Sequence, residues 1–159
     1  MITSYADLLR TAAQQQQPQR LLFVFTKAEL PQEHNSFQKQ QFESQQGGEL
    51  IPIMCVDKLT EELGSFDDLV AESKYTGKSW DIVFVTTMSG VLGIAPTSKD
   101  ADRPLDSMIE AIKSGNIGHY LAFNLRGELV QLSAVGIDIR NTNAVAFNVG
   151  NNRIVGNVQ

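Results

Sequence analysis

Three short apolar segments, separated by stretches with helical spacing, constrain the fold of this chain more than any other feature of its 159 residues. They are residues 20–26 (RLLFVFT), 50–56 (LIPIMCV) and 80–87 (WDIVFVTT). Each is apolar on both faces of an extended chain, which is typical of strands that helices cover on both sides of a sheet. We therefore expect three buried strands within one sheet.

Helical patterns lie around these strands. A serine and an aspartate three residues apart, the spacing of a capping box, predict helix starts at residues 4–7 and 65–68. Apolar residues recur at helical spacing over 105–112, where Pro104 suits the first helical position and Gly115 supplies the stop. These patterns predict three amphipathic helices.

Two longer segments carry weaker patterns. Residues 28–48 are mostly polar and predict a loop followed by a weakly amphipathic surface helix. Residues 88–103 predict a crossover loop that contains the glycine-bearing stretch 89–93 (SGVLG). This stretch follows a strand, but it lacks the Gly-Lys-Ser/Thr ending of a phosphate-binding loop. We therefore read it as a connection between a strand and a helix.

The order of these patterns indicates the fold class. Helices that alternate with buried strands imply parallel pairing through crossover connections. From residue 119 onward the apolar period changes to two, and turn signals at 126–127 and 150–152 predict a C-terminal antiparallel β-meander. The expected class is α/β, with α+β as the alternative. We expect a single domain, 1–159, with one mixed sheet, a Gln-rich linker at 14–19 and a C-terminal β-hairpin extension at 135–159.

Composition excludes several classes of function. With 13 basic and 18 acidic side chains, the formal net charge is −5, and no stripe of Lys and Arg offers the phosphate contacts that nucleic acids need. No apolar run approaches the roughly 20 residues of a membrane span. The first ten residues also lack the basic start and apolar stretch of a signal peptide. We expect a cytoplasmic protein that binds neither nucleic acid nor membrane.

Metal and thiol chemistry find little support in the residue types. Cys55 is the only cysteine, so an internal disulfide and a Cys-rich zinc site are excluded. His34 and His119 show no metal-ligand spacing. We expect no cofactor and no metal.

Several segments resemble a known family. They are residues 19–25 (QRLLFVF), 28–31 (AELP), 54–58 (MCVDK), 80–85 (WDIVFV) and the expected helix at 105–115. Together they resemble a family of small bacterial proteins often labelled "ribonucleotide reductase subunit alpha". The resemblance covers about residues 5–133 and supplies no catalytic residue for this chain.

The reaction in that label has chemical requirements that this chain does not meet. Ribonucleotide reduction of that kind needs a thiyl radical on one cysteine, commonly a redox-active pair of further cysteines, and a catalytic barrel much longer than this chain. Cys55 stands alone and lies in an expected buried strand, where a thiol behaves as a small apolar group. We therefore do not expect ribonucleotide reduction.

A ligand site, if one exists, is expected where the loops after Thr26, Val56 and Thr87 meet, because open α/β sheets bind ligands at the carboxyl ends of their parallel strands. Six side chains at these ends are the candidate ligand-binding residues: Lys27, Asp57, Lys58, Thr86, Thr87 and Ser89. The two lysines would supply positive charge for a small anionic ligand or a nucleotide. Asp57 and Lys58 make a weak acid–base pair, because adjacent strand residues point to opposite faces.

No set of residues with catalytic spacing is present, so we expect a non-catalytic interaction or accessory protein with a protein partner. The alternative is a binding module for a small anionic ligand or nucleotide. Residues 141–159 contain six asparagines and one charged residue, Arg153, and so lack the charges that protect an exposed sheet edge. We therefore expect a homodimer that pairs through the C-terminal strands.

Overall fold

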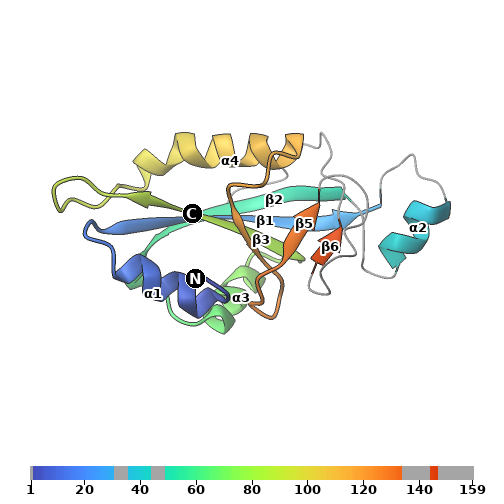
Figure 1. The fold of residues 1–159 in the computed structure, drawn as a ribbon, viewed down its shortest axis with the longest axis horizontal. Helices are drawn as coiled ribbons and strands as arrows, with labels where there is room; N and C mark the ends of the chain where they lie inside the picture. The colour runs from blue at the N-terminus through green and yellow to red at the C-terminus, as the bar shows by residue number, and fades with distance from the viewer. Residues whose placement is uncertain (1, 31–35, 44–48, 134–143, 147–159) are drawn as a thin grey trace.

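The computed structural model describes residues 2–30, 36–43, 49–133 and 144–146, and it shows helices on both faces of a four-stranded sheet (Figure 1). The sheet has the strand order β2-β1-β3-β4. Its strands are β1 (Gln19–Glu29), β2 (Glu49–Leu59), β3 (Ile82–Ser89) and β4 (Leu121–Phe123). The expectation of one mixed α/β domain is confirmed.

The helices lie on opposite sides of the sheet (Figure 1). One side carries α1 (Tyr5–Ala13) and α3 (Phe66–Lys74), and the other carries α4 (Asp102–Ser114). The helix α2 (Ser36–Glu43) lies to one side of this sandwich (Figure 1). Short 3-10 turns precede α3 and α4: η1 (Thr60–Glu62) and η2 (Lys99–Ala101). No helix among the described residues is both long and apolar enough to cross a membrane.

The central strand shows why the apolar segments carry no polar face. Leu21, Phe23 and Phe25 of β1 pack toward α1 and α3, whereas Leu22 and Val24 pack toward α4. All five side chains are almost completely buried. Successive side chains of a strand point to opposite faces, so a strand between two helical layers must be apolar at every position. The prediction of three buried strands is confirmed.

Three of the predicted helix boundaries, two starts and one end, are confirmed. The Ser4 hydroxyl accepts a hydrogen bond from the Asp7 amide, and Ser65 and Asp68 cap α3 reciprocally. Gly115 ends α4 in the left-handed conformation, with φ of 84°. Pro104 does not open α4, because the helix begins two residues earlier and continues directly from η2. Pro104 is tolerated there because amides of the first turn have no partner within the helix.

The expected parallel pairing is not found among the three apolar strands. β1 pairs antiparallel with β2 on one side and with β3 on the other. β2 and β3 therefore run in the same direction, and α3 connects them as a crossover helix, but β1 lies between them. The alternation of strands and helices cannot reveal such an inserted strand, because pairing partners depend on tertiary structure.

The C-terminal part differs from the expected meander. β4 pairs antiparallel with β3, and the turn at 126–127 is a hairpin turn, because Phe123 bridges Leu129 across it. The next two strands, β5 (Gln131–Ser133) and β6 (Ala144–Ala146), pair in parallel, so an antiparallel meander is not confirmed. Except for β6, the expected extension at 135–159 lies outside the described residues.

Candidate functional site

Antiparallel pairing separates the six candidate residues. Lys27 lies opposite Ile51, near the start of β2, and its Nζ donates to the Ser79 hydroxyl at 3.1 Å. Lys58 lies seven residues further along β2, roughly 23 Å away at ~3.3 Å per residue. The expected convergence of three loops therefore does not occur, because the end of β1 lies beside the beginnings of its neighbours.

The other five candidates lie at one end of the sheet but not on one face. Leu22 lies between Asp57 and Thr86, and Leu21 lies between Lys58 and Thr87, in the two register rows across the sheet. Residues directly opposite each other share a face, so Asp57 and Thr86 lie on the α4 side.

Lys58 and Thr87 belong to the α1 and α3 side of the sheet. The Lys58 Nζ pairs there with a Glu72 carboxylate oxygen of α3 at 2.7 Å. The fifth candidate, Ser89, accepts a hydrogen bond at its hydroxyl from the Gln19 side-chain amide at 3.1 Å. Lys58 and Ser89 therefore each already have a partner from the chain itself.

Arg20, which the sequence did not single out, occupies the position next to Asp57. Its Nη1 donates to Asp57 Oδ2 at 2.6 Å, and its Nε donates to the Pro96 carbonyl at 2.8 Å. The Ser98 hydroxyl donates to the other Asp57 oxygen at 3.1 Å. Both members of the ion pair are buried. The arrangement fastens residues 96–98 to the sheet and leaves neither Asp57 oxygen without a partner.

The sequence contains a signal for this cluster, but the signal can be used only when the register of the two strands is known. Arg20 and Leu22 share a face of β1 because they are two residues apart, and Leu22 lies opposite Asp57. With antiparallel pairing assumed, a basic residue at the start of one apolar strand and an acidic residue at the end of another would be placed together.

The segment between β3 and η2 begins with a tight turn, residues 91–94 (VLGI), which we call the apolar turn. Val91 and Ile94 exchange two backbone hydrogen bonds of 3.0 Å. Leu92 and Gly93 between them have φ of 53° and 79°. Positive φ at both central residues is what a type I′ hairpin turn requires. Leu92 is the only described residue other than glycine with positive φ, a conformation that costs an L-residue roughly 1–2 kcal/mol.

The apolar turn exposes its side chains. Val91, Leu92 and Ile94 are 69%, 88% and 72% exposed. The turn projects beyond the sheet, at the left end of the molecule in Figure 1. The expected loop at 88–103 therefore contains the end of β3, this turn, η2 and the start of α4. Gly93 is the only local signal for the turn, because leucine is not a residue that type I′ turns favour.

The connection between α1 and β1 holds the apolar turn in place. The Gln17 side-chain oxygen accepts a hydrogen bond from the Gly93 amide at 2.7 Å, and the Pro18 carbonyl accepts one from the Gly90 amide at 2.8 Å. A Cβ atom at Gly90 would collide with the Ile94 carbonyl, so glycine is required for the close approach. Neither 11–19 nor 82–98 contains a charged residue. We call residues 14–18 and 89–98 the uncharged end.

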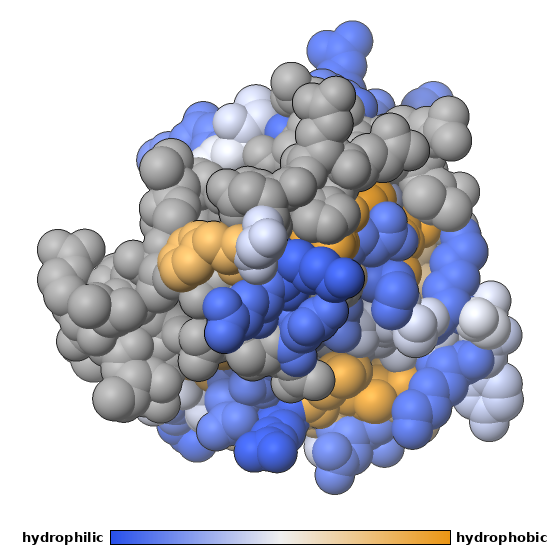
Figure 2. All heavy atoms as spheres, turned by 90° about the vertical axis from the view of Figure 1, so that its right-hand side faces the viewer, coloured by the Kyte–Doolittle hydropathy of each residue, from blue (hydrophilic) through white to orange (hydrophobic). Residues whose placement is uncertain are grey.

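An open groove, which we call the α4–β5 groove, lies between the C-terminal end of α4, β4 and β5, and its surface is polar and apolar in about equal parts. Its volume is about 530 Å³. Phe84, Ile117, Ala122 and Val130 are its buried lining residues, and Tyr120 and Leu132 are among the others. None of its described lining residues is charged. Figure 2 shows the molecule from the side where α4 ends, with apolar surface visible between hydrophilic side chains.

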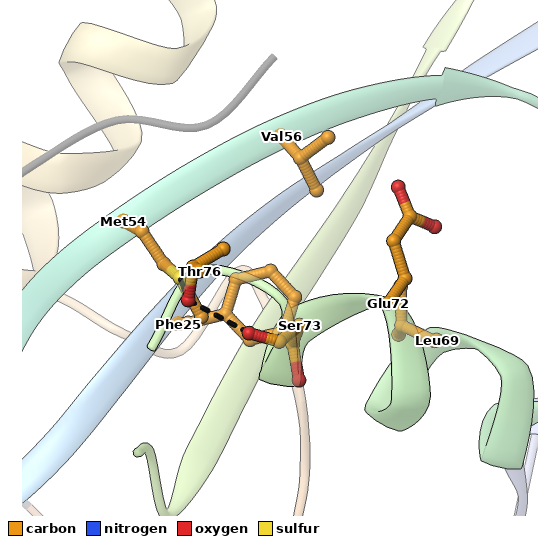
Figure 3. A pocket seen from close by; sticks show the side chains of 7 residues that line it. All are labelled: Phe25, Met54, Val56, Leu69, Glu72, Ser73 and Thr76. Atoms are coloured by element: carbon orange, nitrogen blue, oxygen red, sulfur yellow. Dashed lines mark hydrogen bonds between the residues drawn. The ribbon is translucent and has the colours of Figure 1, made fainter. Parts of the chain in front are cut away.

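A second cavity lies between the sheet and α3. Figure 3 shows the side chains that line it, among them Phe25, Met54, Ser73 and Thr76. It offers about 20 Å³ of space that water can occupy, enough for one molecule. Pockets for small organic ligands measure about 300–1,000 Å³. The Ser73 hydroxyl is already engaged by the Trp80 indole N–H at 2.8 Å and by the Val70 carbonyl at 2.6 Å.

Among the described residues, three titratable groups have shifted pKa values, and each shift has a structural cause. Burial, with the nearby Glu72 charge, raises the pKa of Tyr5 above its usual range. Among the described residues no group hydrogen-bonds the buried Tyr5 hydroxyl. Hydrogen bonds from Thr3 and from Arg10 lower the pKa of Asp7. Hydrogen bonds from Thr97 lower the pKa of Asp100.

These groups do not form a catalytic arrangement. Asp7 lies in α1, and Asp100 caps η2 through reciprocal hydrogen bonds with Thr97 of 2.9 and 3.1 Å. In the part of the chain that the structure describes, no three His, Cys, Asp or Glu side chains gather as they would to hold a metal ion. Comparison of the chain with protein-family models, with curated proteins and with solved structures gives no match.

Proposed function

We propose that this protein is a non-catalytic interaction protein whose uncharged end is its contact surface and whose apolar turn is the centre of the contact. The observation that carries the proposal is the exposure of three aliphatic side chains, Val91, Leu92 and Ile94, on an ordered turn. Single exposed apolar residues are normal on protein surfaces, but clustered ones mark interaction sites.

The anchoring of the apolar turn supports this function. Gln17 and Pro18 hold the turn from one side, and the Arg20 and Asp57 pair holds residues 96–98 at its base. A contact element that is already in its bound shape loses little conformational entropy on binding. The left-handed Leu92 adds to the argument, because strained backbone persists only where its surroundings enforce it and often lies at functional positions.

The charge distribution points to a protein partner. Charged residues are depleted at the centres of protein interfaces, whereas nucleic acids and anionic membranes attract basic surfaces. The uncharged end carries aliphatic side chains beside four consecutive glutamines, residues 14–17. Binding through such a surface is expected to change little with salt, because screening acts on charges.

The alternative, a module for a small anionic ligand, has weaker support. Lys27 and Lys58 lie at opposite ends of the sheet. The Lys58 ammonium group pairs with Glu72, and the Asp57 carboxylate pairs with Arg20. No observation on the described residues favours an anion at the end of the sheet where Asp57 and Lys58 lie.

The test compares three forms of the full chain as bait in affinity capture from a cell extract. Leu92→Asn removes the most exposed side chain and keeps the turn, because asparagine adopts positive φ readily. Tyr75→Asn, at a 92% exposed residue beyond α3, is the matched control. We expect partners retained by the wild type and by Tyr75→Asn to be lost by Leu92→Asn at both low and high salt. Equal capture by all three forms would contradict the proposal.

A further inference from the structure

We propose that the partner is held as an added strand: an extended, uncharged segment of another protein pairs with the exposed end of β3, beside the apolar turn. This inference rests on the proposed function, because the same end of the molecule makes the contact. It adds the kind of partner that this end fits and the backbone groups that bind it.

The end of β3 is paired on one side only. β1 pairs with every residue of β3, whereas β4 pairs only with residues 83–85. Among the described residues none pairs on the β4 side with residues 86–89, which we call the open edge. Figure 1 shows this end of β3 running toward the apolar turn. The open edge is therefore a gap in the sheet between the start of β4 and the turn.

The register shows which backbone groups face this gap. The Gly90 amide donates to the Pro18 carbonyl at 2.8 Å, so Gly90 continues the pairing with β1. In an antiparallel pair, residues that bond the partner strand alternate with residues whose backbone groups point away from it. The even-numbered residues of β3 therefore bond β1, and the amides and carbonyls of Thr87 and Ser89 point into the gap. Both residues are exposed, and these backbone groups have no hydrogen-bond partner among the described residues.

An extended peptide is the ligand that these groups fit. Unpaired amides and carbonyls along a strand edge are a template for a further strand. Each of Thr87 and Ser89 offers one donor and one acceptor, and a peptide backbone alternates in the same way, whereas an anion only accepts. Residues 86–90 span about 16 Å at ~3.3 Å per residue, so about five residues of a partner fill the gap.

The side chains beside the gap favour an uncharged segment. The segment 82–98 has no charged residue, so no lysine protects this edge as lysines protect many natural sheet edges. Met88 packs on the α4 side of the sheet, and a partner residue opposite it would share that face. A charge placed there would lose water without gaining a countercharge. Because the apolar turn continues the surface at the end of the gap, aliphatic residues that follow the added strand can contact Leu92.

A free segment fits the gap better than the same edge of a second copy does. In each copy the open edge lies between β4 and the apolar turn. If the open edges of two copies paired antiparallel, the apolar turn of each copy would meet β4 of the other. An extended segment without such neighbours meets neither obstacle.

The experiment measures amide hydrogen exchange of the full chain, residue by residue, by NMR. The probe is an uncharged heptapeptide selected for binding to the full chain from a displayed library. We expect the Thr87 and Ser89 amides to exchange rapidly in the free protein and at least about tenfold more slowly in the complex. The Gly90 amide, which already bonds Pro18, is the internal control and should be protected in both states. The inference is overturned if no such peptide binds, or if binding leaves both exchange rates unchanged.

Two methylated forms of the peptide test the main-chain pairing. One form carries N-methyl groups on alternate amides, and the other form carries them on the remaining amides. An added strand bonds the edge through every second residue. One form should therefore bind like the parent peptide, and the other should lose at least about tenfold in affinity. Equal binding by the two forms would show that the peptide is not held as a strand.

The exchange experiment also separates the two kinds of partner. Protection of Thr87 and Ser89 that rises with the concentration of the protein alone, without peptide, would assign the added strand to a second copy. That result would overturn the inference of a separate partner.

Thr87→Pro tests the open edge on the protein itself. Proline removes the Thr87 amide and places its ring in the gap, while pairing with β1 does not use that amide. In the affinity capture described above, Thr87→Pro should lose the same partners as Leu92→Asn. Partners that Leu92→Asn loses and Thr87→Pro keeps would overturn the inference and leave the proposed function standing, whereas partners kept by both would overturn both. The exchange experiment uses the wild type, so it decides the matter if Thr87→Pro does not fold.

Discussion

Two ion pairs involve adjacent residues of β2, yet they differ in almost every property except length. Asp57 pairs with Arg20 at 2.6 Å, and Lys58 pairs with Glu72 at 2.7 Å. The Asp57 side chain is 2% exposed, whereas the Glu72 side chain is 52% exposed. The first pair joins two strands to the base of the apolar turn, and the second joins a strand to a helix at the surface. Burial, and not distance, determines what each pair contributes.

The largest effect is expected from Asp57→Ala. It leaves the Arg20 guanidinium buried without its carboxylate partner, and loss of one member of a buried pair costs roughly 3–5 kcal/mol. The free energy of unfolding, measured in denaturant, should fall by that amount. Asp106→Ala, which removes an exposed acidic residue of α4, is the control and should leave stability almost unchanged. If Asp57→Ala lowered the free energy of unfolding only slightly, the buried pair would contribute no more than an exposed pair does.

Replacing both Arg20 and Asp57 should separate their effect on stability from their effect on the attachment of residues 96–98. In Arg20→Met with Asp57→Val no charge remains buried, so we expect recovery of at least about 2 kcal/mol relative to Asp57→Ala. Residues 96–98 lose their polar attachment all the same, because Pro96 and Ser98 no longer have these partners. Hydrogen exchange at the Gly93 amide should therefore be faster than in the wild type. Unchanged exchange would show that the hydrogen bonds from Gln17 and Pro18 order the turn without the ion pair.

Tyr5 lies on the same side of the sheet as Glu72. We expect Tyr5→Phe to raise the free energy of unfolding by about 1 kcal/mol. The change removes a buried hydroxyl that no described group satisfies. The pKa of Tyr5 is higher in the folded state than in the unfolded state, where it is about 10. The free energy of unfolding is therefore unaffected by this titration below pH 10, and it falls as pH rises above 10. The free energy of unfolding should be measured near pH 7 and above pH 10. Its decrease between the two pH values should be smaller in Tyr5→Phe than in the wild type. An identical fall would assign the alkaline loss to other groups.

The smallest effect is expected from Glu72→Gln. Exposed pairs contribute about 0–1 kcal/mol, and half-exposed Glu72 should be near the lower end. High salt should remove the difference between variant and wild type, because screening weakens surface pairs. A loss as large as that of Asp57→Ala would mean that burial does not distinguish the two pairs.

Local patterns predicted the elements but not their partners. The capping boxes at Ser4 and Ser65 and the stop at Gly115 are local interactions within a few residues, so the sequence contains them completely. Strand pairing joins residues that are far apart in sequence, as in the 37 residues that separate Arg20 from Asp57. The assumption of parallel strands therefore placed Lys27 with Asp57, although antiparallel pairing sets them at opposite ends.

The sequence by itself determined that the chain forms strands buried on both sides, because every position of 20–26 and most of 50–56 and 80–87 must avoid water. It also determined that the segments 11–19 and 82–98 carry no charge. Only the tertiary structure decided that β1 lies between β2 and β3, that Arg20 meets Asp57, and that Gln17 holds an exposed apolar turn. Periodicity records which residues avoid water, whereas pairing and exposure depend on contacts between distant segments that no local pattern encodes.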